Sequence, residues 1–143
     1  MRLLFVCLGN ICRSPTAEAV ARQARPDWTI DSAGTSDWHI GEPPYGPMIA
    51  AAKSHGIEMA DLRARQFSLA DFKKFDLILA MDAKNFATIK ALRQDQGGAK
   101  LKLLTDFAEG SVNEVPDPYY TRDFQGCITL IEECIEGLSA TYA

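Results

Sequence analysis

The 143-residue sequence has no apolar run that approaches the ~20 residues of a membrane-spanning helix. It also lacks an excess of positive charge, since 15 lysines and arginines stand against 19 aspartates and glutamates, for a net charge of −4. This balance argues against nucleic acid or an anionic membrane surface as the main partner. We therefore expect a cytoplasmic protein with neither of these partners.

Soft metal ligands are scarce as well. The chain has two histidines, and none of its four cysteines forms a Cys-x2-Cys pair. This argues against a zinc site, and we expect neither a metal nor another cofactor. The cysteines do not indicate a disulfide framework either, because a chain of this length is not a small secreted scaffold.

Short apolar runs alternate with helical patterns along the whole chain, and the length suits one domain over residues 1–143. Strands are predicted at 3–6, 28–31, 77–80 and 101–104, and helices at 15–24, 47–53, 69–73, 83–92 and 124–138. Glycine and proline punctuate residues 32–46 and 105–120, which we predict to be loops. The alternation predicts a three-layer α/β fold, a doubly wound four-stranded parallel sheet with helices on both faces. Ligands of such sheets bind at the carboxyl ends of the strands.

The loop after the first strand, residues 7–15, reads Cys-Leu-Gly-Asn-Ile-Cys-Arg-Ser-Pro. We expect Ser14 to cap the following helix and Pro15 to take its first position. Gly9 and Asn10 permit the unusual backbone angles of a tightly curled loop. Inward-pointing N–H groups and the helix N-terminus would then form a cup for an anion.

Cys7 and Arg13 give this cup a chemical direction. Five residues separate them, so a curled loop brings a thiol beside a guanidinium. A thiol in that setting loses its proton readily, and a tetrahedral oxyanion fits the cup with Arg13 holding two of its oxygens. The alternative is a buried structural cysteine and a surface arginine, which the placement of the pair between a strand and a helix disfavours.

Residues 7–15 resemble the phosphate-binding loop of the low-molecular-weight protein tyrosine phosphatases, and Asp-Pro-Tyr-Tyr at 117–120 is similar to a second segment of that family. The resemblance implies a phosphate-binding loop after the first strand and hydrolysis of phosphotyrosine and small aryl phosphates. It implies that Cys7 is the nucleophile and forms a cysteinyl-phosphate intermediate. Arg13 would bind phosphate and stabilise the transition state, and Asp117 would be the general acid and then the general base.

The resemblance also implies roles for neighbouring residues. Phosphate and substrate contacts would come from Leu8, Gly9, Asn10, Ile11, Cys12, Ser14, Trp38, Tyr119 and Tyr120, and Ser32 would support the loop. Aromatic walls make a deep slot that suits a phenyl phosphate, and a phosphoserine side chain would fall short of them. The family's supporting network often includes a histidine where this chain has Leu62, so that contact is absent or replaced here.

The other cysteines raise separate possibilities. In some family members, a cysteine at the position of Cys12 forms a reversible disulfide with the nucleophile. The alternative is that Cys12 is a small residue packed behind the loop. Cys127 and Cys134 match a spacing found in related arsenate reductases. Seven residues apart on one helix, their Cα atoms would lie about 10 Å apart, beyond the roughly 7 Å limit of a disulfide. We predict that these two pack in the core.

Two alternative functions stay open. One is an arsenate reductase of the same fold, and the other is a catalytically silent phosphotyrosine-binding module, which the joint presence of Cys7, Arg13 and Asp117 disfavours. The expected partners are phosphotyrosine-containing proteins, with a tyrosine kinase as one candidate. Inorganic phosphate or vanadate should compete for the site. We expect a monomer or a weak dimer.

Overall fold

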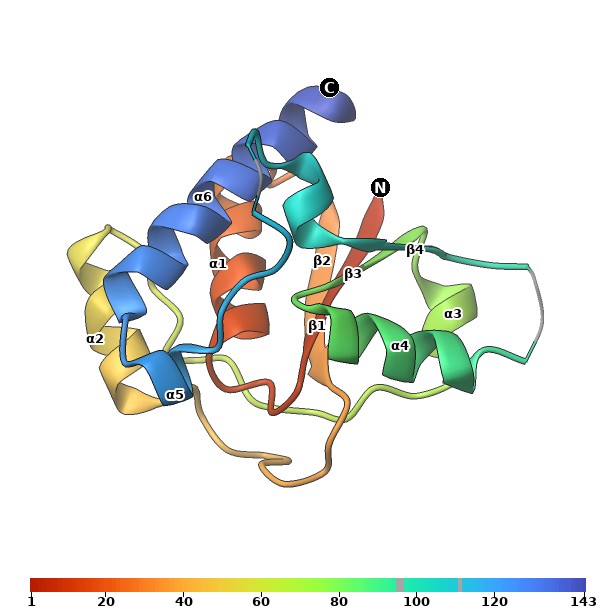
Figure 1. Ribbon diagram of the computed structural model, residues 1–143, viewed down its shortest axis with the longest axis horizontal. Helices are drawn as coiled ribbons and strands as arrows, with labels where there is room; N and C mark the ends of the chain where they lie inside the picture. Colours follow the sequence, from red (N-terminus) through yellow and green to blue (C-terminus); the bar gives the residue numbers. More distant parts are fainter. Residues whose placement is uncertain (95–96, 111) are drawn as a thin grey trace.

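A computed structural model describes residues 1–94, 97–110 and 112–143. Four parallel strands form one sheet in the order β2-β1-β3-β4 (Figure 1). The strands are β1 (Arg2–Cys7), β2 (Thr29–Gly34), β3 (Leu77–Ala80) and β4 (Lys100–Leu103). The helices are α1 (Arg13–Ala24), α2 (Gly46–Ser54), α3 (Asp71–Lys74), α4 (Ala83–Leu92), the 3-10 helix η1 (Leu104–Phe107), α5 (Pro118–Thr121) and α6 (Phe124–Thr141). The predicted three-layer α/β fold with a parallel sheet is confirmed.

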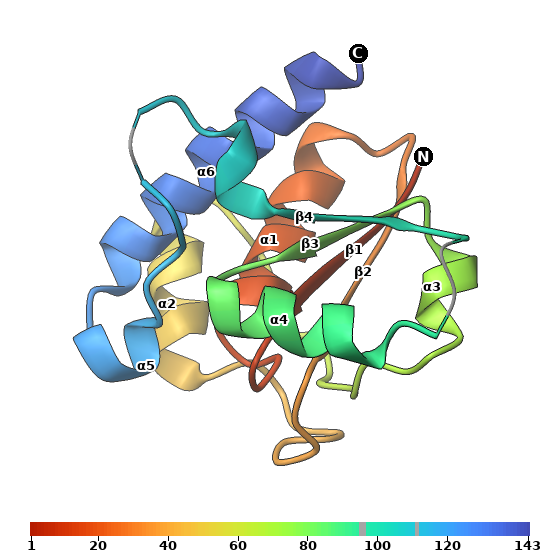
Figure 2. The same ribbon diagram turned by 45° about the vertical axis from the view of Figure 1, so that its right-hand side comes forward.

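β1 is one of the two interior strands, and helices cover both of its faces. Leu3 and Phe5 pack in a cluster with α1, α2 and α6, whereas Leu4 and Val6 pack in a second cluster with α3 and α4. Alternate side chains of a strand point to opposite faces, so a strand buried on both sides is apolar throughout. The two views in Figures 1 and 2 show these helix layers on either side of the sheet.

The loop that follows β1 occupies a special place in this topology. β1 pairs with β2 on one side and with β3 on the other. The connection that follows β1 therefore leads to one side of this strand, and the connection that follows β2 leads across to the other side. A crevice opens where neighbouring connections diverge in this way, at the carboxyl ends of the strands. The sheet therefore presents residues 8–12 at its natural ligand-binding edge.

Several predicted boundaries were wrong. α1 begins at Arg13 with Cys12 as its cap residue, so Ser14 is not the N-cap and Pro15 is not the first helical residue. β2 runs on to Gly34, inside a segment predicted as loop, because it pairs with the whole of β1. η1 and α5 lie in the predicted loop 105–120, and α3 begins at Asp71, two residues later than predicted.

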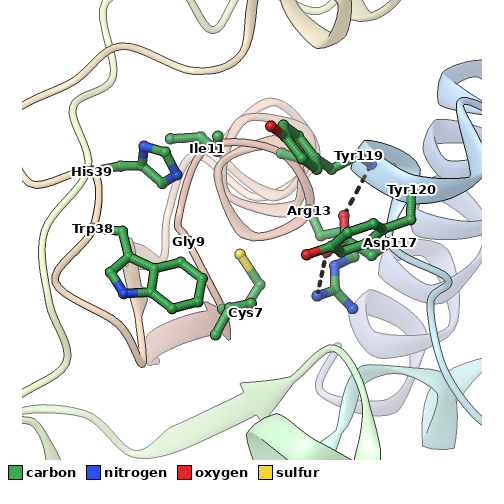
Figure 3. A pocket seen from close by; sticks show the side chains of 11 residues that line it. Cys7, Gly9, Ile11, Arg13, Trp38, His39, Asp117, Tyr119 and Tyr120 are labelled. Carbon is green, nitrogen blue, oxygen red and sulfur yellow. Dashed lines mark hydrogen bonds and ion pairs between the residues drawn. The ribbon is translucent and has the colours of Figure 1, made fainter.

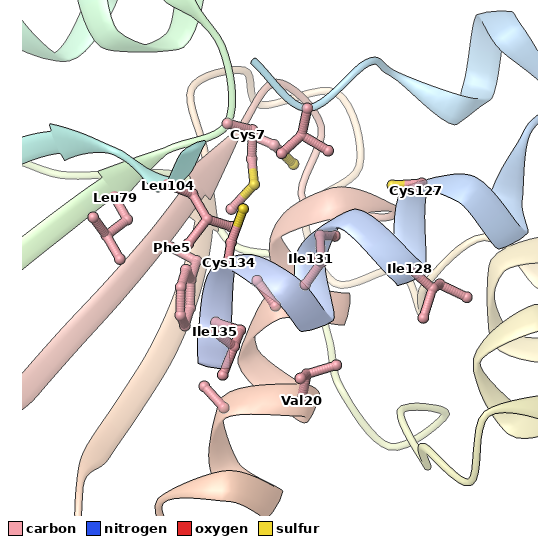
Figure 4. Packing of buried hydrophobic residues seen from close by; sticks show 14 of the residues in the cluster. Phe5, Cys7, Val20, Leu79, Leu104, Cys127, Ile128, Ile131, Cys134 and Ile135 are labelled. Carbon is pink, nitrogen blue, oxygen red and sulfur yellow. The ribbon is translucent and has the colours of Figure 1, made fainter. Parts of the chain in front are cut away.

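α6 supplies much of the core on the α1 side of the sheet (Figure 4). Cys127 and Cys134 point into this layer with 5% and 0% of their surface exposed, which confirms the prediction of core packing. Burial raises the pKa of each thiol to about 12. Within the described ranges, neither α6 nor any other helix has the length and apolar character needed to cross a membrane.

Candidate active site

The predicted phosphate-binding loop, residues 7–14 and called the phosphate loop below, starts at the last residue of β1, where Cys7 is 3% exposed. Asn10 adopts a positive φ of 56°, which fits the expectation of an unusual backbone angle there. Gly9 does not adopt a positive φ, so that part of the expectation was wrong. The loop passes over Gly34 so closely that a Cβ on Gly34 would lie 2.8 Å from the Leu8 carbonyl oxygen.

Short polar contacts hold the Cys7 sulfur from behind the loop. The Ser14 hydroxyl lies 2.9 Å from Cys7 Sγ, and the Asn10 N–H donates to the same sulfur at 3.2 Å. The Asn10 side-chain amide donates to the hydroxyls of Ser14 at 2.8 Å and Ser32 at 2.9 Å. The Cys7 sulfur is thus held by the Ser14 hydroxyl and the Asn10 N–H, and Asn10 links Ser14 to Ser32.

A backbone contact supports Asn10 beside the position where the family often has histidine. Leu62 is half-buried and packs against the core instead. The Asn10 side-chain oxygen Oδ1 accepts a hydrogen bond from the backbone N–H of Arg65 at 3.0 Å. The Arg65 guanidinium is fixed in turn by Asp31 and, through two nitrogens, by Asp71. This clamp ties the phosphate loop to β2 and to the start of α3.

Glu18 extends the support network and was not foreseen from the sequence. The Ser32 hydroxyl donates to Glu18 Oε1 at 2.6 Å, and Arg22 pairs with Oε2 at 2.5 Å. Burial raises the pKa of Glu18, and the Ser32 hydrogen bond and the Arg22 charge oppose that effect only in part. A glutamate in a helix usually faces solvent, so no sequence signal distinguished this one.

Arg13 is buried at the floor of the site. Its Nη1 donates to Asp82 Oδ2 at 2.7 Å and to the Val115 carbonyl at 2.9 Å, while Nη2 lies 3.5 Å from Asp117 Oδ2. Burial lowers the pKa of Arg13, but the charges of Cys7, Asp82 and Asp117 outweigh burial and leave it raised. The guanidinium therefore stays charged and is aimed by two carboxylates.

Asp82 is a second residue of the site that was not predicted from the sequence. It is the N-cap of α4, since its Oδ1 accepts the Asn85 N–H at 2.8 Å. Its other oxygen holds Arg13. An aspartate two residues after β3 lies at the same edge of the sheet as the loop after β1, and this placement was the signal that could have revealed the contact.

Asp117 lies beside Arg13, on the side of the pocket across from Trp38 (Figure 3). It caps α5, with its Oδ1 accepting the Tyr119 N–H at 3.0 Å and Pro118 in the first helical position. This cap turns the carboxylate toward the space above Arg13. The chain thus brings together two segments that lie more than one hundred residues apart.

The pocket has a volume of about 240 Å³. Its lining residues are Cys7, Leu8, Gly9, Ile11, Cys12, Arg13, Trp38, His39, Asp117, Tyr119 and Tyr120. Trp38 and His39 stand on one side and Tyr119 and Tyr120 on the other, with Cys7 between them (Figure 3). The predicted residues Asn10, Ser14 and Ser32 lie behind the loop and not in the lining. A flat apolar group between the two sides would place an attached oxyanion over the sulfur.

Cys12 lies in the same loop and is buried. Its pKa is raised, first by burial and then by the neighbouring charge of Cys7. His39 also lines the pocket; its ring lies near Gly9, and its Nδ1 forms a hydrogen bond with Glu42. Among the described residues, no three histidine, cysteine, aspartate or glutamate side chains gather closely enough to hold a metal ion.

Comparison with known proteins agrees with this geometry. The sequence profile described as low molecular weight phosphotyrosine protein phosphatase matches residues 2–142. The low molecular weight protein-tyrosine-phosphatase YfkJ of Bacillus subtilis is 40% identical over an alignment of 146 positions, which covers 97% of this chain and 94% of YfkJ. The crystal structure of YfkJ superposes with a TM-score of 0.93, over 99% of this chain and 93% of that one.

Two further solved structures are similar. A protein tyrosine phosphatase from Entamoeba histolytica is 38% identical, with a TM-score of 0.93 over 99% of this chain and 96% of that chain. Vibrio vulnificus Wzb, solved in complex with benzylphosphonate, is 29% identical, with a TM-score of 0.89 over 98% and 97% of the two chains. The chain belongs to the low molecular weight protein tyrosine phosphatase family, a family of hydrolases.

Proposed function

We propose that this protein hydrolyses phosphotyrosine and small aryl phosphates through a cysteinyl-phosphate intermediate. The observation that carries the proposal is the convergence of three groups on one pocket: the Cys7 thiol, the Arg13 guanidinium and the Asp117 carboxylate. Arg13 and Asp117 lie 3.5 Å apart, although they come from opposite ends of the chain. Phosphate transfer to sulfur requires these three chemical types.

In the first step the Cys7 thiolate attacks phosphorus in line with the aryl oxygen. The S–P bond forms as the P–O bond to the aryl group breaks, and Asp117 gives its proton to the departing phenol oxygen. Arg13 and N–H groups of the phosphate loop hold the equatorial oxygens and stabilise their developing charge. The products are the free phenol and phosphorylated Cys7.

In the second step water attacks the phosphorus of the intermediate. Asp117, now ionised, takes a proton from this water, the S–P bond breaks, and inorganic phosphate leaves with the Cys7 thiolate restored. The charge of the transferring group is balanced by Arg13 and backbone N–H groups, so the proposed mechanism uses neither a metal nor another cofactor.

The walls define the substrate class. Trp38, Tyr119 and Tyr120 would flank a phenyl ring, and Leu8 and Ile11 would contact its edge near the loop. Proteins phosphorylated on tyrosine, among them a tyrosine kinase, are the proposed substrates, and inorganic phosphate and vanadate the proposed competitors. We further propose that the protein is a single domain that acts in the cytoplasm as a monomer or a weak dimer. These points rest on the sequence.

A direct assay tests the function. Hydrolysis of p-nitrophenyl phosphate is measured with a chelator present, at mildly acidic pH, with and without vanadate. Cys7→Ser should abolish turnover and keep measurable phosphate binding, because the cup remains. Cys127→Ser is the matched control, since Cys127 is equally buried but lies outside the pocket. Full activity of the Cys7→Ser variant would contradict the mechanism. Thioredoxin-coupled arsenate reduction without phosphate ester hydrolysis would favour the arsenate reductase alternative.

Cys12 is proposed as a redox partner of Cys7. Peroxide would oxidise Cys7 to a sulfenic acid, and the Cys12 sulfur would displace hydroxide from it, giving a disulfide and water. The two cysteines share the loop, which supports the proposal, whereas burial and the raised pKa of Cys12 oppose it. Mass spectrometry after mild peroxide should show a Cys7–Cys12 bond; a sulfinic acid at Cys7 without such a bond would contradict it.

A further inference from the structure

The proposed mechanism depends on how two separate segments are placed relative to each other. The phosphate loop carries the nucleophile, and the acid segment, residues 117–122, carries the general acid. α5 within the acid segment has only four residues and lies mostly at the surface. A helix this short does not hold its own conformation in water. Contacts with the rest of the protein must therefore fix the position of Asp117.

Tyr45 touches the phosphate loop through its backbone. It is the cap residue of α2, and its N–H donates to the Ile11 carbonyl at 2.8 Å. Tyr45 is half-buried and packs against the main core cluster, so its own position is well fixed. One end of this residue is thus anchored to the wall of the phosphate cup.

The side chain of Tyr45 touches the acid segment. Its ring centroid lies 5.4 Å from that of Tyr119, with the ring planes inclined at 54°. Its hydroxyl accepts a hydrogen bond from Arg122 Nη1 at 3.1 Å, and the Arg122 guanidinium lies 5.5 Å over the Tyr45 ring. These are an aromatic pair and a cation–π contact, each of which favours one relative placement of the groups.

The contacts then continue to the acid itself. The backbone N–H of Tyr119 donates to Asp117 Oδ1, so a shift of Tyr119 would move the carboxylate. α2 and α5 lie next to each other in both views (Figures 1 and 2). Tyr45 therefore contacts the loop that holds the nucleophile and the residue that orients the acid.

We propose that Tyr45 is a positioning residue that joins the phosphate loop to the acid segment and so sets the distance between Asp117 and the leaving oxygen. This inference rests on the proposed function. Proton transfer in the transition state requires the acid within hydrogen-bond reach of the leaving oxygen, and a displacement of about 1 Å costs up to a hundredfold in rate. Loss of Tyr45 should therefore weaken acid catalysis more than nucleophilic attack.

Substrates that differ in their leaving groups separate these two effects. Phenol is a poor leaving group and needs a proton, whereas 2,4-dinitrophenol leaves readily without one. Tyr45→Ala should lower kcat/KM about tenfold for phenyl phosphate but only about twofold for 2,4-dinitrophenyl phosphate. kcat/KM is the right quantity because it covers binding and the first chemical step. Tyr45→Phe, which keeps the ring and the backbone contact, should restore most of the lost rate on phenyl phosphate.

Further variants and measurements serve as controls for this comparison. Asp117→Asn should show the same substrate dependence more strongly, and if it did not, the proposed function would fail independently of Tyr45. Tyr142→Ala is the matched control, because Tyr142 is also half-buried and packs against a ring, that of Phe107, away from the pocket. Thermal unfolding and vanadate affinity report whether the fold and the cup survive. Tyr45→Leu, which keeps apolar bulk, provides the same comparison if Tyr45→Ala is unstable.

The outcomes are distinct. A larger loss on phenyl phosphate than on the dinitrophenyl ester, with vanadate affinity retained, supports the positioning role. An equal loss on both esters, or no loss on either, while Asp117→Asn behaves as expected, overturns the role of Tyr45 and leaves the proposed function standing.

Discussion

The phosphate loop differs in burial from the pocket rim, which is formed by the exposed side chains of Trp38 and Tyr120. In the loop, Cys7, Asn10 and Arg13 are almost wholly buried, and short hydrogen bonds or ion pairs hold all three. In the rim, Trp38 is 67% exposed and Tyr120 is 72% exposed. Trp38 and Tyr120 thus keep most of their surface in solvent, whereas the loop is as deeply buried as the core beneath it.

This difference separates the two kinds of contribution that a site residue makes. Removing a buried polar group leaves its partners without hydrogen bonds, so it costs stability together with activity. Removing an exposed aromatic ring leaves the fold intact and alters only what the pocket can bind. Loop variants should therefore lose activity and stability in parallel, and rim variants should lose activity alone.

The largest effect is expected for Arg13→Lys. A lysine keeps the charge but cannot bond Asp82, the Val115 carbonyl and two phosphate oxygens with one planar group. We expect kcat/KM for p-nitrophenyl phosphate to fall about a thousandfold, and the free energy of unfolding in urea to fall by about 1–3 kcal/mol. Arg63→Lys, at an exposed arginine, is the control. An unchanged free energy of unfolding in Arg13→Lys would contradict the expectation that loop variants lose stability together with activity.

A smaller effect is expected for Trp38→Ala. Loss of the wall should raise KM for a phosphotyrosine peptide by about three- to tenfold, because the ring loses a stacking partner. The free energy of unfolding should change by less than about 0.5 kcal/mol, as for other exposed sites. Leu69→Ala provides the comparison, since Leu69 is an exposed apolar residue outside the pocket lining. A marked loss of stability in Trp38→Ala would show that the rim is part of the folded core after all.

The smallest effect concerns Glu18, behind the loop. Burial raises its pKa in the folded state, so its contribution to stability is full below the ordinary value of 4.5 and is lost as pH rises through the folded-state value. Wild-type stability should therefore fall relative to Glu18→Gln as pH rises above 4.5. Urea unfolding across this range measures the difference, and Glu136→Gln, at an exposed glutamate of α6, is the control. A constant difference between wild type and Glu18→Gln would contradict the raised pKa.

Much of the site followed from the sequence because the loop is contiguous. Cys7 and Arg13 lie between a strand and a helix, so local chain geometry alone brings them to one cup. Asp117 was found by its resemblance to a family segment, and the structure places it in the same pocket. The predicted cap at Ser14 failed because the serine hydroxyl had a competing partner, the Cys7 sulfur, on the preceding strand.

The sequence by itself determined the order of strands and helices and the position of the loop, after the first strand, that we propose binds phosphate. Those features depend on near neighbours and on the alternation of apolar runs. Only the tertiary structure decided that Asp82 aims Arg13, that Arg65 holds Asn10, and that Tyr45 joins the loop to the acid segment. Each of these contacts joins segments far apart in the chain, and the packing of helices on the sheet selects such partners without leaving a local pattern in the sequence.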